Sequence, residues 1–354
     1  MQIGIPSEVK TLEGRVALIP EAAGELVKQG HEVFIQRGAG KHSGYSDDDY
    51  EAVGLSVVEN AQVLFEKSRL IVKVKEPQAQ ELSLFRRDHI LFSYLHLAAE
   101  LPLMEKLQAI GLTAIAFETV ETADGRLPLL APMSDIAGRI AVQVGATLLH
   151  RPQGGKGLLL GGLPAAPRGQ VVILGAGVAG GNAALLAAGM GANVTVFDRN
   201  RDKLEAMRRL GANVTALYPY QASLKEAVRQ ADLLIGAVLV TGERAPHLVD
   251  AEMVKSMQAG SVIIDISVDQ GGCIETTKPT NYKNPTFLWE NVVHFGVTNM
   301  PGAVPRSASQ ALSAAILPYV SALGGPQWRD HAELSAGINV KDGEILHPAL
   351  KLVK

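Results

Sequence analysis

Short apolar runs alternate with helical patterns through most of this chain of 354 residues. Such runs, when bounded by glycine, proline or polar residues, are typical of buried strands. They predict strands at Gln2–Pro6, Glu32–Gln36, Leu70–Lys75, Ile90–His96, Thr113–Phe117, Val171–Leu174, Asn193–Phe197, Asn213–Ala216, Asp232–Val240, Ser261–Ile266 and Val293–Val297. Because helical spacing lies between many of them, the pattern predicts an α/β fold whose parallel sheets carry helices on both faces.

Three longer stretches have the spacing of helices. Pro20–Gln29 has a proline in its first turn and Gly30 as its stop. Ala131–His150 is mostly apolar with few helix breakers, and we interpret it as a connector between two domains. Ser307–Leu323 also has helical spacing, whereas residues 334–354 show no clear pattern.

A glycine motif follows the predicted strand Val171–Leu174. Gly175, Gly177 and Gly180 have the spacing GxGxxG, a helix-compatible run comes next, and the following strand ends at Asp198. In a dinucleotide-binding turn, the first glycine allows the tight turn, the second lets the backbone approach a pyrophosphate, and the third lets helix and strand pack closely. An acidic residue about 20 positions further on binds a ribose 2′-hydroxyl. The alternative is a glycine-rich turn in an ordinary α/β domain.

The same region resembles a membrane span at first sight, because residues 171–197 contain no charge. Six glycines and two asparagines interrupt it, and its pattern changes from strand to helix to strand, so we reject that interpretation. No charged segment followed by an apolar one opens the chain, which predicts a cytoplasmic protein without a signal peptide.

Composition excludes several classes of protein. Hydrophobic residues make up 47% of the chain, which is enough for a large core, and the net charge of −3 gives no electrostatic case for nucleic acid or an anionic membrane. The single cysteine, Cys273, rules out an internal disulfide and a site built from several cysteines. No metal-ligand spacing and no nucleophile–base pair is present, so we expect no metal.

Four polar residues stand near the ends of predicted strands, where open α/β sheets bind ligands: Arg15, Lys75, His96 and Asp269. Singly, each has an ordinary explanation as a solvated charge, a structural histidine or a turn-forming aspartate. Together they suit a substrate with a carboxylate and a carbonyl or amine. Arginine binds carboxylates bidentately, lysine can donate to a keto oxygen, histidine exchanges a proton near neutral pH, and the aspartate could orient an ammonium or a water.

The sequence resembles the alanine dehydrogenases almost from end to end. The matching segments are Ile3–Pro6 with Glu8, Arg15–Leu18, Lys73–Pro77, Leu95–Ala98, Pro128–Ser134, Gly175–Gly180, Ile235–Leu239, Asp269–Cys273 and Asn299–Gly302. Many separate matches in the same order are far more specific than the glycine motif alone. Pro219 departs from the pattern, since many relatives carry a serine after the tyrosine that matches Tyr218.

The resemblance implies reversible NAD-dependent oxidative deamination of L-alanine to pyruvate and ammonium. It implies two Rossmann-like domains with parallel sheets joined by long helices: a substrate domain of residues 1–130 and 306–354, and an NAD-binding domain of residues 131–305. It also implies Arg15 and Lys75 as substrate ligands, His96 and Asp269 as catalytic residues, and a homohexamer. The residues it assigns to the cofactor, together with the three motif glycines Gly175, Gly177 and Gly180, are Ser134, Val178, Ala179, Asp198, Lys203, Val238, Leu239, Ile266, Ser267, Val268, Asp269, Val297, Thr298, Asn299 and Met300.

Two other functions stay open on the sequence. One is that of the transhydrogenase nucleotide-binding subunit, which shares the fold and moves hydride between two nicotinamide cofactors. It needs no substrate set such as Arg15, Lys75 and His96, so their joint presence favours the dehydrogenase. The other is a non-catalytic NAD-binding regulatory module.

Overall fold

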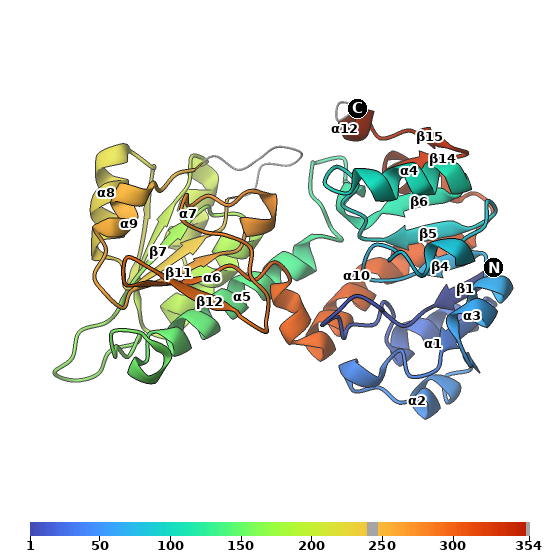
Figure 1. Cartoon of the computed structure of the whole chain (residues 1–354), viewed down its shortest axis with the longest axis horizontal. Coiled ribbons are helices and arrows are strands. Elements are labelled where there is room, and N and C mark those ends of the chain that lie inside the picture. The colour runs from blue at the N-terminus through green and yellow to red at the C-terminus, as the bar shows by residue number, and fades with distance from the viewer. Residues whose placement is uncertain (239–246, 352–354) are drawn as a thin grey trace. The chain divides into compact units, whose positions relative to one another are not determined.

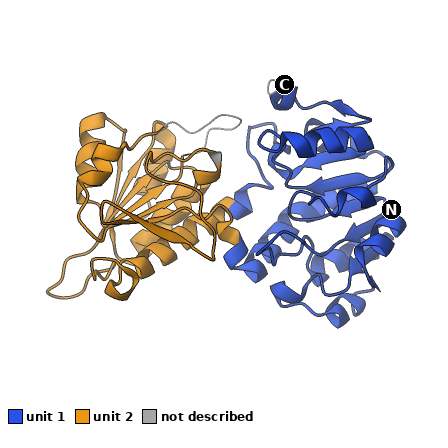
Figure 2. Ribbon diagram, in the orientation of Figure 1, with its two compact units in different colours: residues 1–133, 302–354 blue, residues 134–301 orange. Residues whose placement is uncertain are grey.

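A computed structural model describes residues 1–238 and 247–351 of the chain. They form two compact units, Met1–Met133 with Gly302–Lys354, and Ser134–Pro301 (Figure 2). The predicted cofactor residue Leu239 and the end of the predicted strand Asp232–Val240 lie outside the described residues.

The second unit contains a seven-stranded sheet in the order β12-β13-β11-β10-β7-β8-β9. Its strands are β7 (Gln170–Leu174), β8 (Asn193–Phe197), β9 (Val214–Leu217), β10 (Leu233–Gly236), β11 (Val262–Asp265), β12 (Thr286–Trp289) and β13 (Val292–Phe295). All pairs are parallel except β12 with β13. The chain runs outward from β7 in one direction and then from β10 in the other, which is the strand order of a Rossmann fold.

The helices of the second unit pack on this sheet as their sequences require. They are α5 (Ala131–Leu148), which begins at the end of the first unit, α6 (Val178–Gly189), α7 (Arg201–Arg208), α8 (Gln221–Gln230) and α9 (Ala251–Lys255). Leu224 and Val228 of α8 and Met253 of α9 join one apolar core with the sheet residue Ile263. On α7, the Asn200 side chain caps the first turn by accepting hydrogen bonds from backbone N–H groups.

Glycine lets α6 lie against its neighbours. A Cβ on Gly180 would overlap the carbonyl oxygen of Gly175, and a Cβ on Gly138 of α5 would overlap that of Ala179. The turn itself needs glycine, because Gly175 has φ +95°. The start of α6 is therefore held between β7 and α5.

The first unit repeats the same strand order in a sheet of eight strands, β15-β14-β6-β5-β4-β1-β2-β3. Its strands are β1 (Gln2–Ile5), β2 (Glu32–Gln36), β3 (Ser56–Val58), β4 (Leu70–Val72), β5 (Ile90–Ser93), β6 (Thr113–Ala116), β14 (Ile338–Lys341) and β15 (Glu344–Ile345). The first six are parallel, and the hairpin of β14 and β15 adds antiparallel strands beside β6 (Figure 1). The order reverses between β1 and β4.

Helices cover both faces of this sheet. They are α1 (Pro20–Lys28), α2 (Asp47–Glu51), α3 (Ala61–Lys67), α4 (Leu101–Ile110), α10 (Pro305–Gly324), α11 (Ala332–Ala336) and α12 (Pro348–Lys351). Gly4 of β1 faces Leu64 of α3, so its neighbours Ile3 and Ile5 point to the opposite face. On one face, α3 and α4 share a core cluster with the sheet, while α1 and α10 pack against each other.

The predicted fold class of two Rossmann-like α/β units is confirmed. Several boundaries differ. β4 stops at Val72 and β5 at Ser93, so Lys75 and His96 lie on loops just beyond their strands. The strands β3 and β12 and the hairpin of residues 338–345 were not predicted, because all of them are short and β14 carries a polar residue at every second position. In the part of the chain that the structure describes, no helix is long and apolar enough to cross a membrane.

Gly180→Ala should destabilise the second unit, because the new Cβ would collide with a backbone carbonyl that cannot move aside. Overpacking of this kind costs about 1–3 kcal/mol. Gly189→Ala, in the same helix, is the matched control: its Cβ would meet nothing within 4 Å, and alanine favours a helix over glycine by up to about 1 kcal/mol. The midpoint of urea unfolding measures both, and equal midpoints for the two variants would contradict the packing described for α6.

Candidate functional site

The carboxyl ends of four neighbouring strands in the first unit present the candidate substrate residues. Arg15 lies on the loop after β1, Lys75 on the segment after β4, and His96 after β5. Glu118 follows β6, in a short 3-10 helix, Phe117–Thr119. Since β1 and β4 are adjacent and the strand order reverses there, Arg15 and Lys75 flank the position where open α/β sheets form a crevice.

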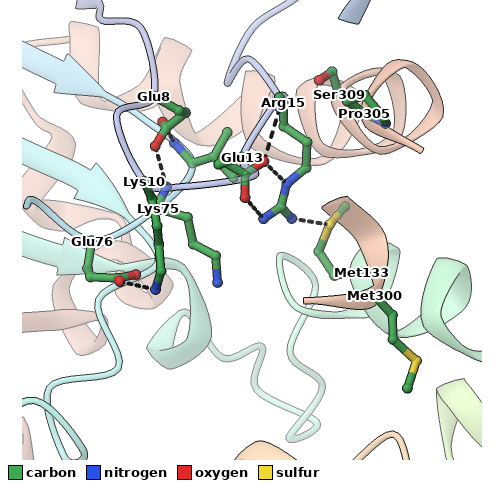
Figure 3. Close-up of polar contacts among 12 residues, drawn as sticks. Glu8, Lys10, Glu13, Arg15, Lys75, Glu76, Met133, Met300, Pro305 and Ser309 are labelled. Atoms are coloured by element: carbon green, nitrogen blue, oxygen red, sulfur yellow. Dashed lines mark hydrogen bonds and ion pairs between the residues drawn. The ribbon is translucent and has the colours of Figure 1, made fainter. Parts of the chain in front are cut away.

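Arg15 is buried and held by Glu13 (Figure 3). Its Nε donates a hydrogen bond of 2.6 Å to Glu13 Oε1, and its Nη2 donates one of 2.5 Å to Oε2. Nη1 lies 3.0 Å from the sulfur of Met133. Burial lowers the pKa of the guanidinium, but the hydrogen bonds and charge of Glu13 outweigh it, so the pKa is raised and Arg15 stays positive. A bidentate partner on one edge fixes the plane of the guanidinium.

Lys75 lies beside this pair, with Lys10 and Glu76 on its other side (Figure 3). Its backbone N–H donates a hydrogen bond of 3.2 Å to Glu8 Oε2, and Glu76 forms an ion pair with Lys10. Burial lowers the pKa of the Lys75 amine, and the positive charges of Arg15 and Lys10 lower it further against the opposing effect of Glu76. Lys75 therefore becomes neutral at a lower pH than a solvated lysine.

His96 has a backbone conformation that side chains rarely adopt, with φ +50°. Glu118 stabilises it: Oε1 accepts a hydrogen bond of 2.6 Å from the backbone N–H of His96, and that of Leu95 also points to the carboxylate at 3.2 Å. Oε1 lies 3.9 Å from His96 Nδ1. The ring stacks parallel to that of Tyr94, with centroids 5.9 Å apart. Strained backbone held by specific contacts is common at functional sites.

Tyr94 connects the histidine to the arginine. Its hydroxyl donates a hydrogen bond of 2.6 Å to the carbonyl oxygen of Leu129, and its ring is buried. Burial raises the pKa of the phenol, while the positive charge of Arg15 acts in the opposite direction. Arg15, Lys75, Tyr94 and His96 thus belong to one cluster in the first unit.

The glycine turn of the second unit fits a dinucleotide. Gly177 precedes α6, no side chain caps the helix, and a Cβ on Gly177 would meet nothing within 4 Å. The backbone N–H groups at the helix start are therefore open to a phosphate. Asp198 follows β8, as predicted, and accepts hydrogen bonds from the backbone N–H of Ala176, at 2.7 Å, and of Asn200, at 2.8 Å. The same carboxylate retains lone pairs for a ribose hydroxyl.

Most other predicted cofactor residues share this edge of the second sheet, because they follow the carboxyl ends of parallel strands. Val178, Ala179 and Gly180 begin α6 after β7, Val238 follows β10, Ile266, Ser267, Val268 and Asp269 follow β11, and Val297, Thr298, Asn299 and Met300 follow β13. Two come from helices other than α6. Ser134 lies on α5, whose Asp135 accepts a hydrogen bond of 2.6 Å from Asn182 of α6, and Lys203 is exposed on α7.

Asp269 lies in a short 3-10 helix of the second unit, Val268–Gln270, and is exposed. Buried Asp265 holds this loop, because its carboxylate accepts hydrogen bonds from Ser267, Cys273 and Thr277. The catalytic role of Asp269 beside the substrate stays a prediction. So does the participation of the other predicted site residues in binding.

The sequence analysis did not select three residues of this site: Glu13, Tyr94 and Glu118. Glu118 fixes the backbone of His96, whereas Glu100, which is closer to His96 in sequence, is exposed at the start of α4. Glu118 follows the strand next to that of His96, so the same strand-end reasoning would have found it. Glu13, only two residues from Arg15, carries no pattern that separates it from a solvated acid.

A dinucleotide turn in one Rossmann-like unit and a buried cationic cluster at the strand ends of another define an α/β oxidoreductase that uses a nicotinamide cofactor. The chain belongs to the alanine dehydrogenase/PNT family. The model of the family's N-terminal domain matches residues 4–137, and that of its C-terminal domain matches residues 141–348.

Known relatives extend this similarity over the whole chain. Alanine dehydrogenase from Mycolicibacterium smegmatis is 47% identical over 355 aligned positions, which cover 99% of this chain and 96% of the relative. A solved structure of an L-alanine dehydrogenase, 50% identical, superposes with a TM-score of 0.97 and covers 100% of this chain and 99% of its own. A transhydrogenase from Sinorhizobium meliloti is 26% identical, with a TM-score of 0.85 and coverage of 99% and 100%.

Lys75 should react with an amine-directed reagent at a lower pH than a solvated lysine, because burial and the charge of Arg15 favour its neutral form. Competitive labelling followed by mass spectrometry of the Lys75 peptide gives the midpoint. Arg15→Met removes one opposing charge and should move the midpoint to higher pH, whereas Arg15→Lys should leave it low. A midpoint that is the same in both variants would contradict the electrostatic coupling of these two residues.

Proposed function

We propose that this protein catalyses the reversible oxidative deamination of L-alanine to pyruvate and ammonium, with NAD as the hydride acceptor. The observation that carries the proposal is the pair of cations, Arg15 and Lys75, at the strand-order reversal of the first sheet, beside Tyr94 and His96. The similarity to a relative named alanine dehydrogenase, at 47% identity, supports it.

The cation pair suits a small 2-amino or 2-keto acid. Arg15 keeps its charge although it is buried, so it is proposed to bind the substrate carboxylate. The Lys75 ammonium is proposed to donate to the keto oxygen of pyruvate or to the carboxylate. Losing one such charge-assisted contact costs about 1.5–3 kcal/mol.

Proton transfer is assigned to His96. The amine of alanine is neutral when hydride leaves Cα, which gives an iminium; water then adds to that carbon. As the C–N bond breaks, the carbinolamine gives up its hydroxyl proton to form the carbonyl, and the ammonia that leaves takes up that proton to become ammonium. Both later steps move a proton, and a ring nitrogen of His96 is proposed to take it from the attacking water and return it to the leaving amine. Glu118 and Tyr94 fix the backbone and the ring plane. Asp269 is proposed to hold the amine or the water, and the bound cofactor supplies the hydride acceptor.

The transhydrogenase-like function is the second candidate, because a transhydrogenase shares the fold at a TM-score of 0.85. Hydride exchange between two nicotinamide cofactors requires no cationic cluster for a small acid, so the grouping of Arg15, Lys75 and His96 favours the dehydrogenase. The homohexamer and the cytoplasmic location remain proposals that rest on the family resemblance and on the sequence.

Absorbance of the reduced nicotinamide tests the activity. Purified protein with NAD and a panel of small amino acids should form NADH with L-alanine. His96→Ala should lower turnover by about 10²–10⁴-fold, the usual scale for a general acid–base group, without loss of NADH binding. Glu100→Gln, an exposed change near His96, should keep turnover. Hydride exchange between NADPH and an NAD analogue, without NADH formation from any amino acid, would instead identify the second candidate function.

NAD should be preferred to NADP, because Asp198 would face a 2′-phosphate with a like charge. Holding like charges together costs several kcal/mol, so kcat/KM should differ by about 100-fold or more. Asp198→Ala should narrow the difference, mainly by improving the use of NADP. Comparable efficiencies of the wild-type protein with the two cofactors would contradict the prediction. They would indicate that Arg199 and Arg201, which are exposed after the same strand, bind the 2′-phosphate.

A further inference from the structure

Three charged side chains are fully buried next to the candidate substrate site. Lys73 Nζ lies 2.8 Å from Oε1 of Glu81 and donates a hydrogen bond of 2.9 Å to its Oε2. It lies 3.6 Å from Glu8 Oε2. The side chain of Lys73 is 0% exposed, that of Glu8 2% and that of Glu81 4%. Burying charges is unfavourable, and apolar residues of the same volume often stabilise a fold better, so this triad calls for an explanation beyond stability.

The triad holds backbone rather than side chains. Glu8 Oε1 accepts a hydrogen bond of 2.6 Å from the backbone N–H of Val74, and its Oε2 accepts one from Lys75. Glu81 Oε2 accepts a hydrogen bond of 2.8 Å from the backbone N–H of Gln78. β4 has already ended at Val72. The segment that carries Lys75 is therefore fixed by two buried carboxylates.

The triad lies at the carboxyl ends of the adjacent strands β1 and β4. Glu8 lies on the loop after β1, and Lys73 begins the segment after β4, so the triad spans the point where the strand order reverses. The segments that leave such neighbouring strands diverge, which opens the crevice but removes backbone pairing between them. Glu8 replaces that pairing. On the opposite side, the carbonyl oxygen of Val74 accepts a hydrogen bond of 3.0 Å from the backbone N–H of Tyr94.

We propose that Glu8, Lys73 and Glu81 are positioning residues: a buried brace that sets the direction of Lys75 towards the substrate. The single positive charge of Lys73 faces the carboxylates of Glu8 and Glu81, and Lys75 contacts the substrate. The proposal rests on the proposed function, since it takes Lys75 to be a substrate ligand. The outer ion pair of Lys10 and Glu76 joins the same two segments, but Lys10 is 41% exposed, and an exposed pair fixes geometry weakly.

Glu8→Gln tests the brace with almost no change in volume. The amide has one oxygen in place of two and no charge for Lys73. The dissociation constant of pyruvate from the enzyme–NADH complex, followed by NADH fluorescence, should rise about 10-fold or more, as for a lost charge-assisted contact. The dissociation constant of NADH itself should not change, because the dinucleotide turn belongs to the other unit. Glu81→Gln should have the same effect on a smaller scale and replaces Glu8→Gln if that variant does not fold.

A double-mutant cycle with Lys75→Ala separates positioning from general stability. If Glu8 acts through Lys75, Glu8→Gln should add nothing to pyruvate binding once Lys75 is alanine. An equal loss in both backgrounds would overturn the proposal, and so would unchanged pyruvate binding in a folded Glu8→Gln protein. Lys156→Met is the matched control: it breaks another largely buried ion pair, with Asp232 at 2.7 Å, at the amino end of β10. It should lower stability and leave pyruvate binding unchanged.

Labelling of Lys75 keeps the brace testable apart from the activity. Glu8→Gln should change the pH at which Lys75 reacts, because the amine moves relative to Arg15. If the wild-type protein acts on neither alanine nor pyruvate but this midpoint changes, the proposed function and the substrate role of Lys75 fail, whereas the inference that Glu8 sets the position of the Lys75 amine stands. If the protein is active and the midpoint stays the same in Glu8→Gln, the brace fails and the function stands.

Discussion

The organisation of both units depends on the reversal of strand order within a parallel sheet. Crossovers between parallel strands are right-handed, so chains that run outward in opposite directions place their connections on opposite faces. The segments after the two central strands therefore part at the carboxyl edge. In the first unit these segments carry Arg15 and Lys75; in the second, one of them carries the glycine turn of residues 175–177. One topological constraint, used twice, creates room for a small acid and for a dinucleotide.

The structure has opposite effects on the pKa values of the two cations, Arg15 and Lys75. Arg15 is matched edge to edge with Glu13, which keeps it a permanent cation despite burial. The Lys75 amine is destabilised as a cation by burial and by Arg15. A fixed charge suits binding of a carboxylate that never changes charge in the reaction. The Lys75 ammonium can lose its charge more easily, which suits a contact with the substrate carbon where a keto group and an amine interchange. The two cations are thus chemically distinct although they lie close together.

Much of this arrangement could be predicted from the sequence. Apolar runs located most strands of the two sheets, the strand-end rule selected Arg15, Lys75, His96 and Asp269, and the spacing after the glycine motif selected Asp198. The pattern of apolar and polar residues could not predict the conformation of the loops after the strands. The left-handed backbone of His96 depends on a carboxylate 22 residues away, Glu118. The burial of Lys73 could not be told from solvation, because a lysine after a strand has the same local pattern either way. The hairpin β14–β15 pairs with β6 across more than 200 residues, so no local signal marks it.

That hairpin also dictates an order of events while the chain is being made. The second unit is continuous in sequence, whereas the first is completed only when residues 302–354 arrive. Until then, the core positions that Leu312 and Ile316 of α10 fill are empty and the edge of β6 is unpaired. Multidomain chains usually fold from the N-terminus as they emerge from the ribosome. Here the middle of the chain is the first part able to form a complete core. The sheet of the first unit keeps one edge open to other strands until residues 338–341 have been synthesised and can pair with β6.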